Sequence, residues 1–157
     1  MKGQTAVEYL MTYGWAILII LIVAGVLAYY GIFAPSGFLG PSARGFGNIA
    51  VISPWDLTTA EVLKLQIENR AGQEITITNV YVDSSPNSPT TACTGIPVGG
   101  TSYAAAQKAY LPDLTCTGAA TGTPSVSDTY SIGVAIEYSV GTATGLKSTG
   151  TVTGTFS

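Results

Sequence analysis

A long uncharged stretch near the N-terminus constrains this chain more than any other feature. After Glu8 no charged residue occurs until Arg44, and residues 9–34 are rich in Leu, Ile, Val and Ala. About 20 apolar residues in a helix cross the hydrocarbon core of a bilayer, so this run is long enough to span a membrane. Aromatic residues lie near both of its ends: Tyr9, Tyr13, Trp15, Tyr29, Tyr30 and Phe33. Because aromatic side chains favour the two membrane–water interfaces, we expect a transmembrane helix here.

A secretory signal peptide is the competing interpretation of the same segment. The apolar region of such a peptide has about 7–15 residues, follows a basic region and ends at a cleavage site with small residues. Here the apolar run is longer, and Lys2 is the only basic residue ahead of it. Val26, Leu27 and Ala28 match the cleavage site poorly. We therefore expect the segment to be retained.

The composition argues against an enzyme and against a nucleic-acid partner. Charged residues make up 10% of the chain, against roughly 25% in typical soluble domains. The net charge is −3, and no basic cluster is available to follow a phosphate backbone. Histidine is absent, which removes the Ser-His-Asp and Cys-His arrangements and the usual zinc sites. With the nine acidic residues scattered, we predict no catalytic residue, no cofactor and no metal site.

The remainder of the chain has the pattern of β-strands. Apolar and polar residues alternate over residues 62–68, 74–78 and 130–140, and the phase shifts at residues 79–82, as in a β-bulge. Gly, Pro and Asn separate these segments. Short alternating strands with such turns indicate an antiparallel β-sandwich or a small barrel, and of these we expect the sandwich, Ig-like in arrangement. Residues 103–111 predict one short helix between strands.

These patterns predict an α+β chain with a helix and a head. The hydrophobic helix covers residues 4–34, and the β-sandwich head domain covers residues 48–157. Residues 35–47 form a linker, because Pro35, Pro41 and several glycines break the helix and turn the chain.

Two cysteines, Cys93 and Cys116, lie in a long segment rich in Ser, Pro, Thr and Gly. An even count in a membrane-anchored, exported chain favours one disulfide. Closing a loop of this size stabilises a fold by about 3 kcal/mol in the chain-entropy model. The alternative is a pair of buried free thiols in a reducing compartment.

Glu8 is the one carboxylate at the border of the apolar run. A charge at the bilayer centre costs about 2.5–3.5 kcal/mol on insertion scales, and less near the interface. A carboxylate held there is a candidate functional group whose partner should be a cation. The alternative is an interfacial glutamate that reaches back to water.

The residues around Glu8 favour a functional role for its carboxylate over an interfacial side chain that only reaches water. The run from Lys2 through Gly3, Gln4 and Glu8 into the apolar stretch resembles the class III signal of archaeal type IV pilins. In that family a membrane peptidase cuts after a glycine that follows basic residues, the new N-terminus is commonly glutamine, and the fifth residue after the cut is glutamate. Gly3, Gln4 and Glu8 occupy these three positions in register. Residues 1–3 would be the leader peptide, shorter and less basic than leaders typical of the family.

The resemblance implies a structural subunit of an archaeal type IV pilus that serves adhesion. The precursor would lie in the cytoplasmic membrane, and the prepilin peptidase would expose the α-amine of Gln4. The pilus assembly machinery would then bring identical subunits together into an extracellular filament. Within that helical homopolymer, Glu8 would pair with an amine and set the axial register.

Two other functions remain open at this point. One is a monomeric membrane-anchored surface binding protein with an Ig-like head, which predicts an uncleaved anchor and a ligand cleft. The other is a filament subunit of the archaeal motility apparatus, which shares the signal class. An enzyme is the least favoured of all.

Overall fold

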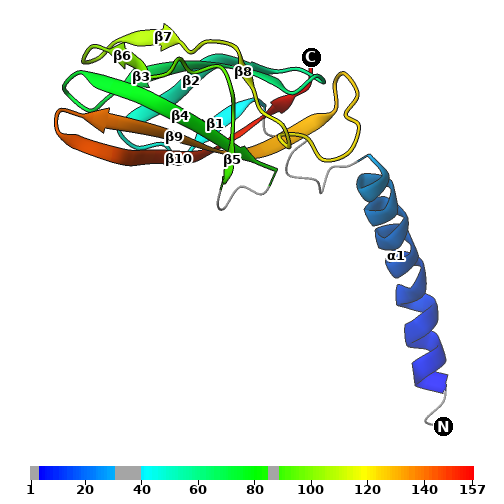
Figure 1. Cartoon of the computed structure of the whole chain (residues 1–157). Helices are drawn as coiled ribbons and strands as arrows, with labels where there is room; N and C mark the ends of the chain where they lie inside the picture. Colours follow the sequence, from blue (N-terminus) through cyan, green and yellow to red (C-terminus); the bar gives the residue numbers. More distant parts are fainter. Residues whose placement is uncertain (1–3, 31–39, 85–88) are drawn as a thin grey trace. The chain divides into compact units, whose positions relative to one another are not determined.

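The computed structural model describes residues 4–30, 40–84 and 89–157. The chain forms two compact units, Met1–Phe38 and Leu39–Ser157, shown in Figure 1. The first contains an apolar helix and the second contains antiparallel β-sheets. The predicted α+β class is therefore confirmed at this level.

The helix α1 spans Gln4–Tyr29. Its residues are mostly Leu, Ile, Val and Ala, and it contains no proline that would break the backbone hydrogen bonding. Gly14 and Gly25 lie within it, and a side chain at either position would meet no atom within 4 Å. Residues 31–34 of the predicted helix, residues 35–39 of the predicted linker and the predicted leader lie outside the described residues.

The described residues of the second unit, 40–84 and 89–157, form ten strands. Their bounds are β1 Ser42–Arg44, β2 Ile49–Leu57, β3 Val62–Asn69, β4 Ile75–Asp83, β5 Thr91–Ala92, β6 Thr101–Tyr103, β7 Lys108–Tyr110, β8 Leu114–Thr115, β9 Thr129–Val140 and β10 Ala143–Thr155. Sheet A has the order β1-β10-β9-β4-β5, with β6 also paired to β4. Sheet B has the order β2-β3-β7, with β8 also paired to β3. All of these pairings are antiparallel.

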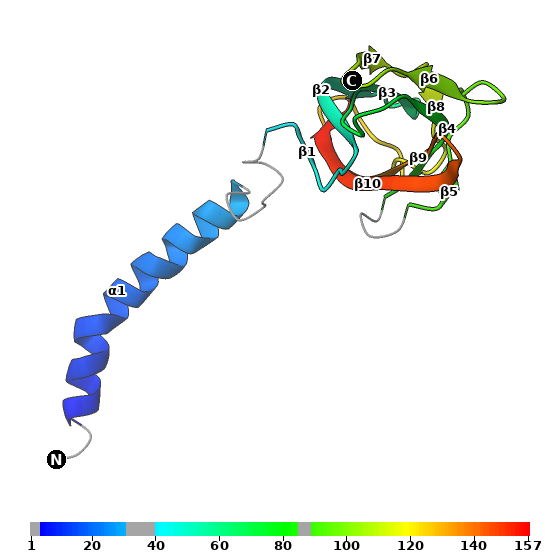
Figure 2. The same cartoon turned by 90° about the vertical axis from the view of Figure 1, so that its left-hand side faces the viewer.

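The apolar faces of both sheets meet in one core. Figure 2 shows β2, β3 and β7 on the opposite side of the head from β9 and β10. Alternation along each strand sends one set of side chains inward and the other outward. The largest fully buried side chains come from both sheets: Ile49, Leu57, Leu63, Leu65, Ile67, Ile75, Ile77, Val80, Val82, Leu114, Ile132 and Ile136. The period-two pattern of the sequence therefore marks the core correctly.

Two local predictions have different outcomes. The pairing of β4 with β9 shifts register between Ile77 and Asn79, which confirms the predicted bulge. The helix predicted for residues 103–111 is wrong. There Tyr103 ends β6, residues 104–107 form a turn, and Lys108–Tyr110 is β7. Pairing with β4 and β3 outweighs the helix propensity of the three alanines.

The head begins earlier than predicted. Ser42–Arg44 forms β1 and pairs with β10, so this part of the predicted linker 35–47 belongs to sheet A. Phe46 packs against Gly150, where a Cβ atom would lie 2.6 Å from the phenylalanine ring. Ser148 then joins the two sheets, since its hydroxyl donates to the carbonyl of Ile49 at 2.8 Å and accepts from the Gly47 N–H at 3.0 Å.

Asn69 is a buried polar residue whose hydrogen bonds hold two turns together. Its amide nitrogen donates to the carbonyls of Gln73 at 2.8 Å, Tyr103 at 3.1 Å and Ala104 at 2.9 Å. Its side-chain oxygen accepts from the Ala71 N–H at 2.9 Å. Because buried polar groups must be paired, this side chain fixes the end of β3 against the turn between β6 and β7.

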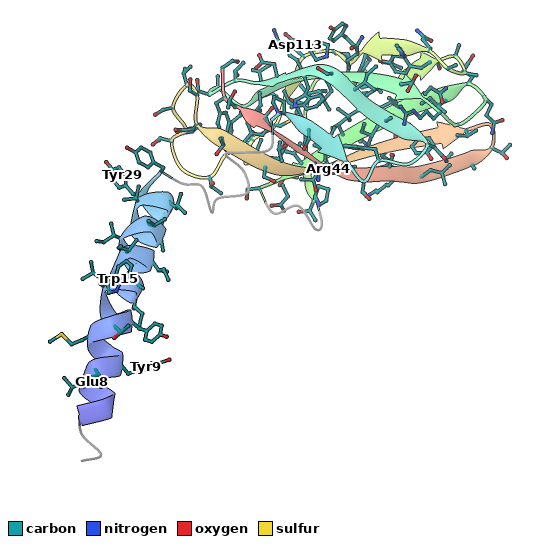
Figure 3. All side chains as sticks on the ribbon, turned by 180° about the vertical axis from the view of Figure 1, so that it is seen from behind. Glu8, Tyr9, Trp15, Tyr29, Arg44 and Asp113 are labelled. Carbon is teal, nitrogen blue, oxygen red and sulfur yellow. A yellow bond between two sulfur atoms is a disulfide. The ribbon has the colours of Figure 1, made fainter. Side chains whose placement is uncertain are left out.

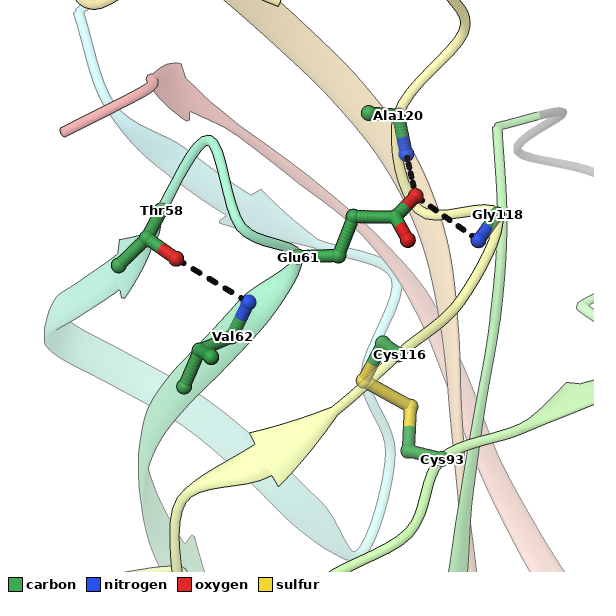
Figure 4. The surroundings of a disulfide bond; sticks show 7 residues. All are labelled: Thr58, Glu61, Val62, Cys93, Cys116, Gly118 and Ala120. Atoms are coloured by element: carbon green, nitrogen blue, oxygen red, sulfur yellow. Dashed lines mark hydrogen bonds between the residues drawn. A yellow bond between two sulfur atoms is a disulfide. The ribbon is translucent and has the colours of Figure 1, made fainter.

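The predicted disulfide between Cys93 and Cys116 is present (Figure 4). The Cys93 N–H donates to the carbonyl of Val80 in β4, and the Cys116 N–H donates to the carbonyl of Glu61, beside β3. Both cysteines are buried in the core. The covalent bond therefore links a segment held by sheet A to a segment held by sheet B.

Candidate functional site

The surface of α1 is the candidate functional site, because most of its large apolar side chains are exposed. Apart from the partly buried Leu27, the large apolar side chains described in this helix are exposed by 48% to 86%. They project on all sides of the helix in Figure 3, where Tyr9, Trp15 and Tyr29 are labelled. A helix that is apolar all round is typical of a membrane span or of the interior of a larger assembly.

The length of this surface matches the thickness of a membrane. The segment Ala6–Tyr29 has 24 residues and contains an 18-residue stretch with a mean hydropathy of 2.4, which makes it long and apolar enough to cross a bilayer. At 1.5 Å per residue it extends for about 36 Å, against a hydrocarbon core of about 30 Å. Length and composition therefore support membrane association of the N-terminal segment.

Aromatic rings mark both ends of this segment. The ring centroids of Tyr9 and Tyr13 lie 4.5 Å apart, and those of Tyr29 and Tyr30 lie 5.6 Å apart. Tyr9 and Tyr29 are separated by about 30 Å of helix, the spacing of the two interfaces of a bilayer. Phe33, the other predicted aromatic at the second end, lies outside the described residues.

Glu8 carries the one charge of α1. The helix begins at Gln4 and has no acidic residue in its first turn, so Glu8 lies in the second turn. The stabilisation of an anion by the helix dipole falls off within the first turn and contributes little here. The side chain of Glu8 is exposed, and its backbone carbonyl accepts a hydrogen bond from Thr12 Oγ1 at 2.8 Å. Its carboxylate is therefore placed on the apolar surface of the helix.

The other predicted assembly residues are only partly described. Gln4 is the first residue of α1, while its side chain and the whole of Gly3 lie outside the part of the chain that the structure describes. The hypothesis that the Gly3–Gln4 bond is cut stays a prediction from the sequence. So does the pairing of Glu8 with the α-amine of Gln4.

Charged side chains of the head form ion pairs around Glu68. On the outer face of sheet B, Oε2 of Glu68 lies 2.6 Å from Nη2 of Arg70, and Oε1 of Glu68 lies 3.6 Å from Nζ of Lys108. The hydrogen bond from Arg70 is the main cause that lowers the pKa of Glu68 below its usual value. Within residues 4–30, 40–84 and 89–157, no three His, Cys, Asp or Glu side chains are grouped so as to hold a metal ion.

One contact in the head was not predicted by any sequence pattern. Glu61 has a positive φ of 60°, and its Oε1 accepts hydrogen bonds from the N–H groups of Gly118 at 2.9 Å and Ala120 at 3.4 Å. The two partners lie more than 50 residues further along the chain, so local periodicity contains no signal for the contact. Figure 4 shows this carboxylate beside the disulfide, where it holds the loop that follows Cys116.

An exposed apolar helix with a single carboxylate can enter lipid, pack against other helices, and accept one cationic partner. No known protein-family model matches the chain, and no curated protein matches it.

Proposed function

We propose that this chain is the structural subunit of an archaeal type IV pilus and polymerises through α1 into an extracellular filament. The observation that carries the proposal is the exposed apolar surface of α1, which begins at Gln4 and carries Glu8 as its one charge. Burying a large apolar side chain stabilises a structure by about 1.5–3 kcal/mol. Such a helix therefore needs lipid or other helices around it.

The same surface suits two successive environments. Before assembly, the helix lies in the cytoplasmic membrane, with Lys2 on the cytoplasmic side. After cleavage behind Gly3, identical helices cover one another in the filament. The change requires no new apolar surface, because lipid contacts are replaced by helix–helix contacts.

Glu8 gives the assembly its register in this proposal. In a bundle of apolar helices an unpaired carboxylate is strongly unfavourable, whereas a carboxylate paired with the α-amine of Gln4 is tolerated. Axial positions that leave Glu8 unpaired are therefore disfavoured.

The second unit would form the outward-facing head, which we propose is an Ig-like β-sandwich. Two antiparallel sheets around one core support this arrangement. Its outer surface would serve adhesion, while its disulfide suits an extracellular location.

The N-terminus of the protein isolated from cells tests the processing step. Mass spectrometry should find a chain that begins at Gln4, and a Gly3→Val variant should keep Met1. A wild-type chain that begins at Met1, or near Tyr29, would exclude a processed pilin. An uncleaved protein without filaments would instead favour the monomeric surface binding protein.

Electron microscopy of shed surface material tests the assembly step. Glu8→Gln keeps the size of the side chain and removes its charge, so the variant should stay in the membrane but form few filaments. Met11→Leu, at an exposed apolar position of the same helix, is the matched control and should assemble normally. Normal filaments from Glu8→Gln would contradict the proposal that Glu8 sets the axial register.

A further inference from the structure

A hollow of about 340 Å³ lies beside the first residues of β9 in the head. One wall is the loop of residues 119–124, and another is formed by residues 128–132, with Phe156 at the side. Small-molecule sites have volumes of about 300–1,000 Å³, so this hollow fits a ligand at the small end of that range.

The lining of the hollow is polar and nearly uncharged. Thr121, Thr123, Thr129 and Ser131 are hydroxyl-bearing residues along it, and all four are exposed. Asp128 is the one ionisable group of the lining apart from the phenol of Tyr130. Asp128 Oδ2 accepts a hydrogen bond from the Ser125 N–H at 2.8 Å, which holds the carboxylate in place at the rim.

This chemistry selects among classes of ligand. An anion is disfavoured, because the described lining contains no Lys or Arg and carries one carboxylate. A purely apolar ligand would leave the hydroxyl groups without water or partners. A polyol satisfies both conditions, since each of its hydroxyl groups both donates and accepts hydrogen bonds. Rings of Tyr130 and Phe156, with centroids 5.1 Å apart, add apolar surface beside the hollow.

We propose that the hollow beside β9 binds a small neutral saccharide. Asp128 accepts hydrogen bonds from hydroxyl groups of the sugar, and the threonine-rich loop surrounds its ring. This site does not depend on whether the chain forms filaments, because every residue that builds it belongs to the head. The head could therefore bind a saccharide at this site whether the chain is a pilus subunit or a monomeric surface protein.

The loop at the site is held in place before any ligand arrives. Glu61 accepts hydrogen bonds from Gly118 and Ala120, and the disulfide fixes Cys116 at the start of the loop. The positive φ of Glu61 is uncommon for a residue with a side chain, and Thr58 stabilises it, since its Oγ1 accepts from the Val62 N–H at 3.1 Å. A loop fixed in this way loses little conformational entropy on binding.

Saturation-transfer NMR on the full chain tests the site. The protein is kept in a detergent whose head group is not a sugar, and glucose, galactose, mannose and N-acetylglucosamine are the probes. We expect transfer to at least one of them. Asp128→Asn, which keeps an acceptor for Ser125, and Thr121→Val, which keeps the side-chain size, should each weaken binding by up to about tenfold.

The control is Thr149→Val, at an exposed threonine of β10 that does not line the hollow. It should leave binding unchanged. Absence of transfer to all four sugars from a folded protein would overturn the proposal, as would equal weakening by Thr149→Val and Thr121→Val. Methylammonium competing with the sugars for the site, lost in Asp128→Asn, would show a cation site instead. None of these outcomes bears on filament assembly, which the Glu8 variant tests separately.

Discussion

The helix and the head differ in how far their apolar side chains are buried. In the head, residues such as Leu65, Ile67 and Val134 are fully buried against one another. In α1, residues such as Leu18, Ile20 and Leu21 are exposed by 57% or more. The apolar residues of the head therefore bury one another in its core, whereas those of α1 are left exposed along the helix.

The difference follows from the spacing of the apolar residues. Along β3 and β9 they recur at every second position, so one face of each strand is apolar and the two sheets can close over a core. Along α1 they occupy every side of the helix, so the helix has no single apolar face. The chain thus combines a domain that buries its own apolar residues with a helix whose apolar surface is exposed on all sides.

The largest expected effect comes from removing the helix. A chain of residues 39–157 should be a monomer in water without detergent, whereas the full chain should require detergent or lipid to stay dispersed. Sedimentation of both proteins with and without detergent measures the difference. If the shortened chain aggregates, the head does not cover its own apolar surface. If the full chain is monomeric in water, the helix has a partner within the chain.

Fluorescence can follow the two regions separately. The chain has two tryptophans, Trp15 in α1 and Trp55 in β2. A Trp15→Phe variant leaves Trp55 to report unfolding of the head, and a Trp55→Phe variant leaves Trp15 to report transfer of the helix into lipid.

The next largest effect is expected at Asn69 in the head. Asn69→Asp would place a carboxylate against the three carbonyl oxygens that now accept from the amide, and should lower the free energy of unfolding by about 4 kcal/mol. Gln73→Glu makes the same charge change at an exposed position of the next turn and should have little effect. Urea denaturation followed by Trp55 measures both variants. Equal effects would show that net charge, and not the buried hydrogen bonds, decides the stability.

The sequence predicts the elements whose pattern is local. The apolar run identifies α1, alternation identifies the core positions of β3, β4 and β9, and the phase shift near Asn79 identifies the bulge. The even count of two cysteines in a chain expected to be exported led us to propose the disulfide over a pair of free thiols, and the structure confirms it.

The missed features depend on contacts that are distant in sequence. Ser42–Arg44 becomes a strand because β10, more than 100 residues away, offers its edge. Within the region of the predicted helix, Tyr103 and Lys108–Tyr110 are extended because β4 and β3 pair with them. The contact of Glu61 with Gly118 and Ala120, and the hollow beside β9, both depend on segments that the folded sheets bring together. None of these contacts leaves a period or a motif in the local sequence.

The disulfide should stabilise the head without affecting the helix. Replacing Cys93 and Cys116 together by alanine opens a loop with a sequence separation of 23 residues and should lower the free energy of unfolding by about 3 kcal/mol. Transfer of Trp15 into lipid should stay unchanged. Reduced transfer would show that α1 and the head depend on each other, which would contradict the separation of the two regions.

The smallest expected effect is a loss of head stability at alkaline pH. Burial, with a contribution from the charge of Asp56, raises the pKa of Tyr130 to about 12. The folded head therefore favours the neutral phenol, and this contribution is complete below the unfolded pKa of about 10. It is lost as the pH rises from there towards 12. The melting temperature followed by circular dichroism should accordingly fall in this range.

Tyr130→Phe cannot ionise, so its melting temperature should fall less steeply over the same range. Tyr110→Phe is the matched control, because Tyr110 is 58% exposed on β7 and its replacement should leave the alkaline slope unchanged. Some slope should remain in both variants, since the hydrogen bond to Glu137 raises the pKa of Tyr81 and burial raises that of Tyr103. An unchanged slope in Tyr130→Phe would mean that the ring reaches water in the folded head, and the core would then be less closed at its β9 end than the contact of Tyr130 with Phe156 indicates.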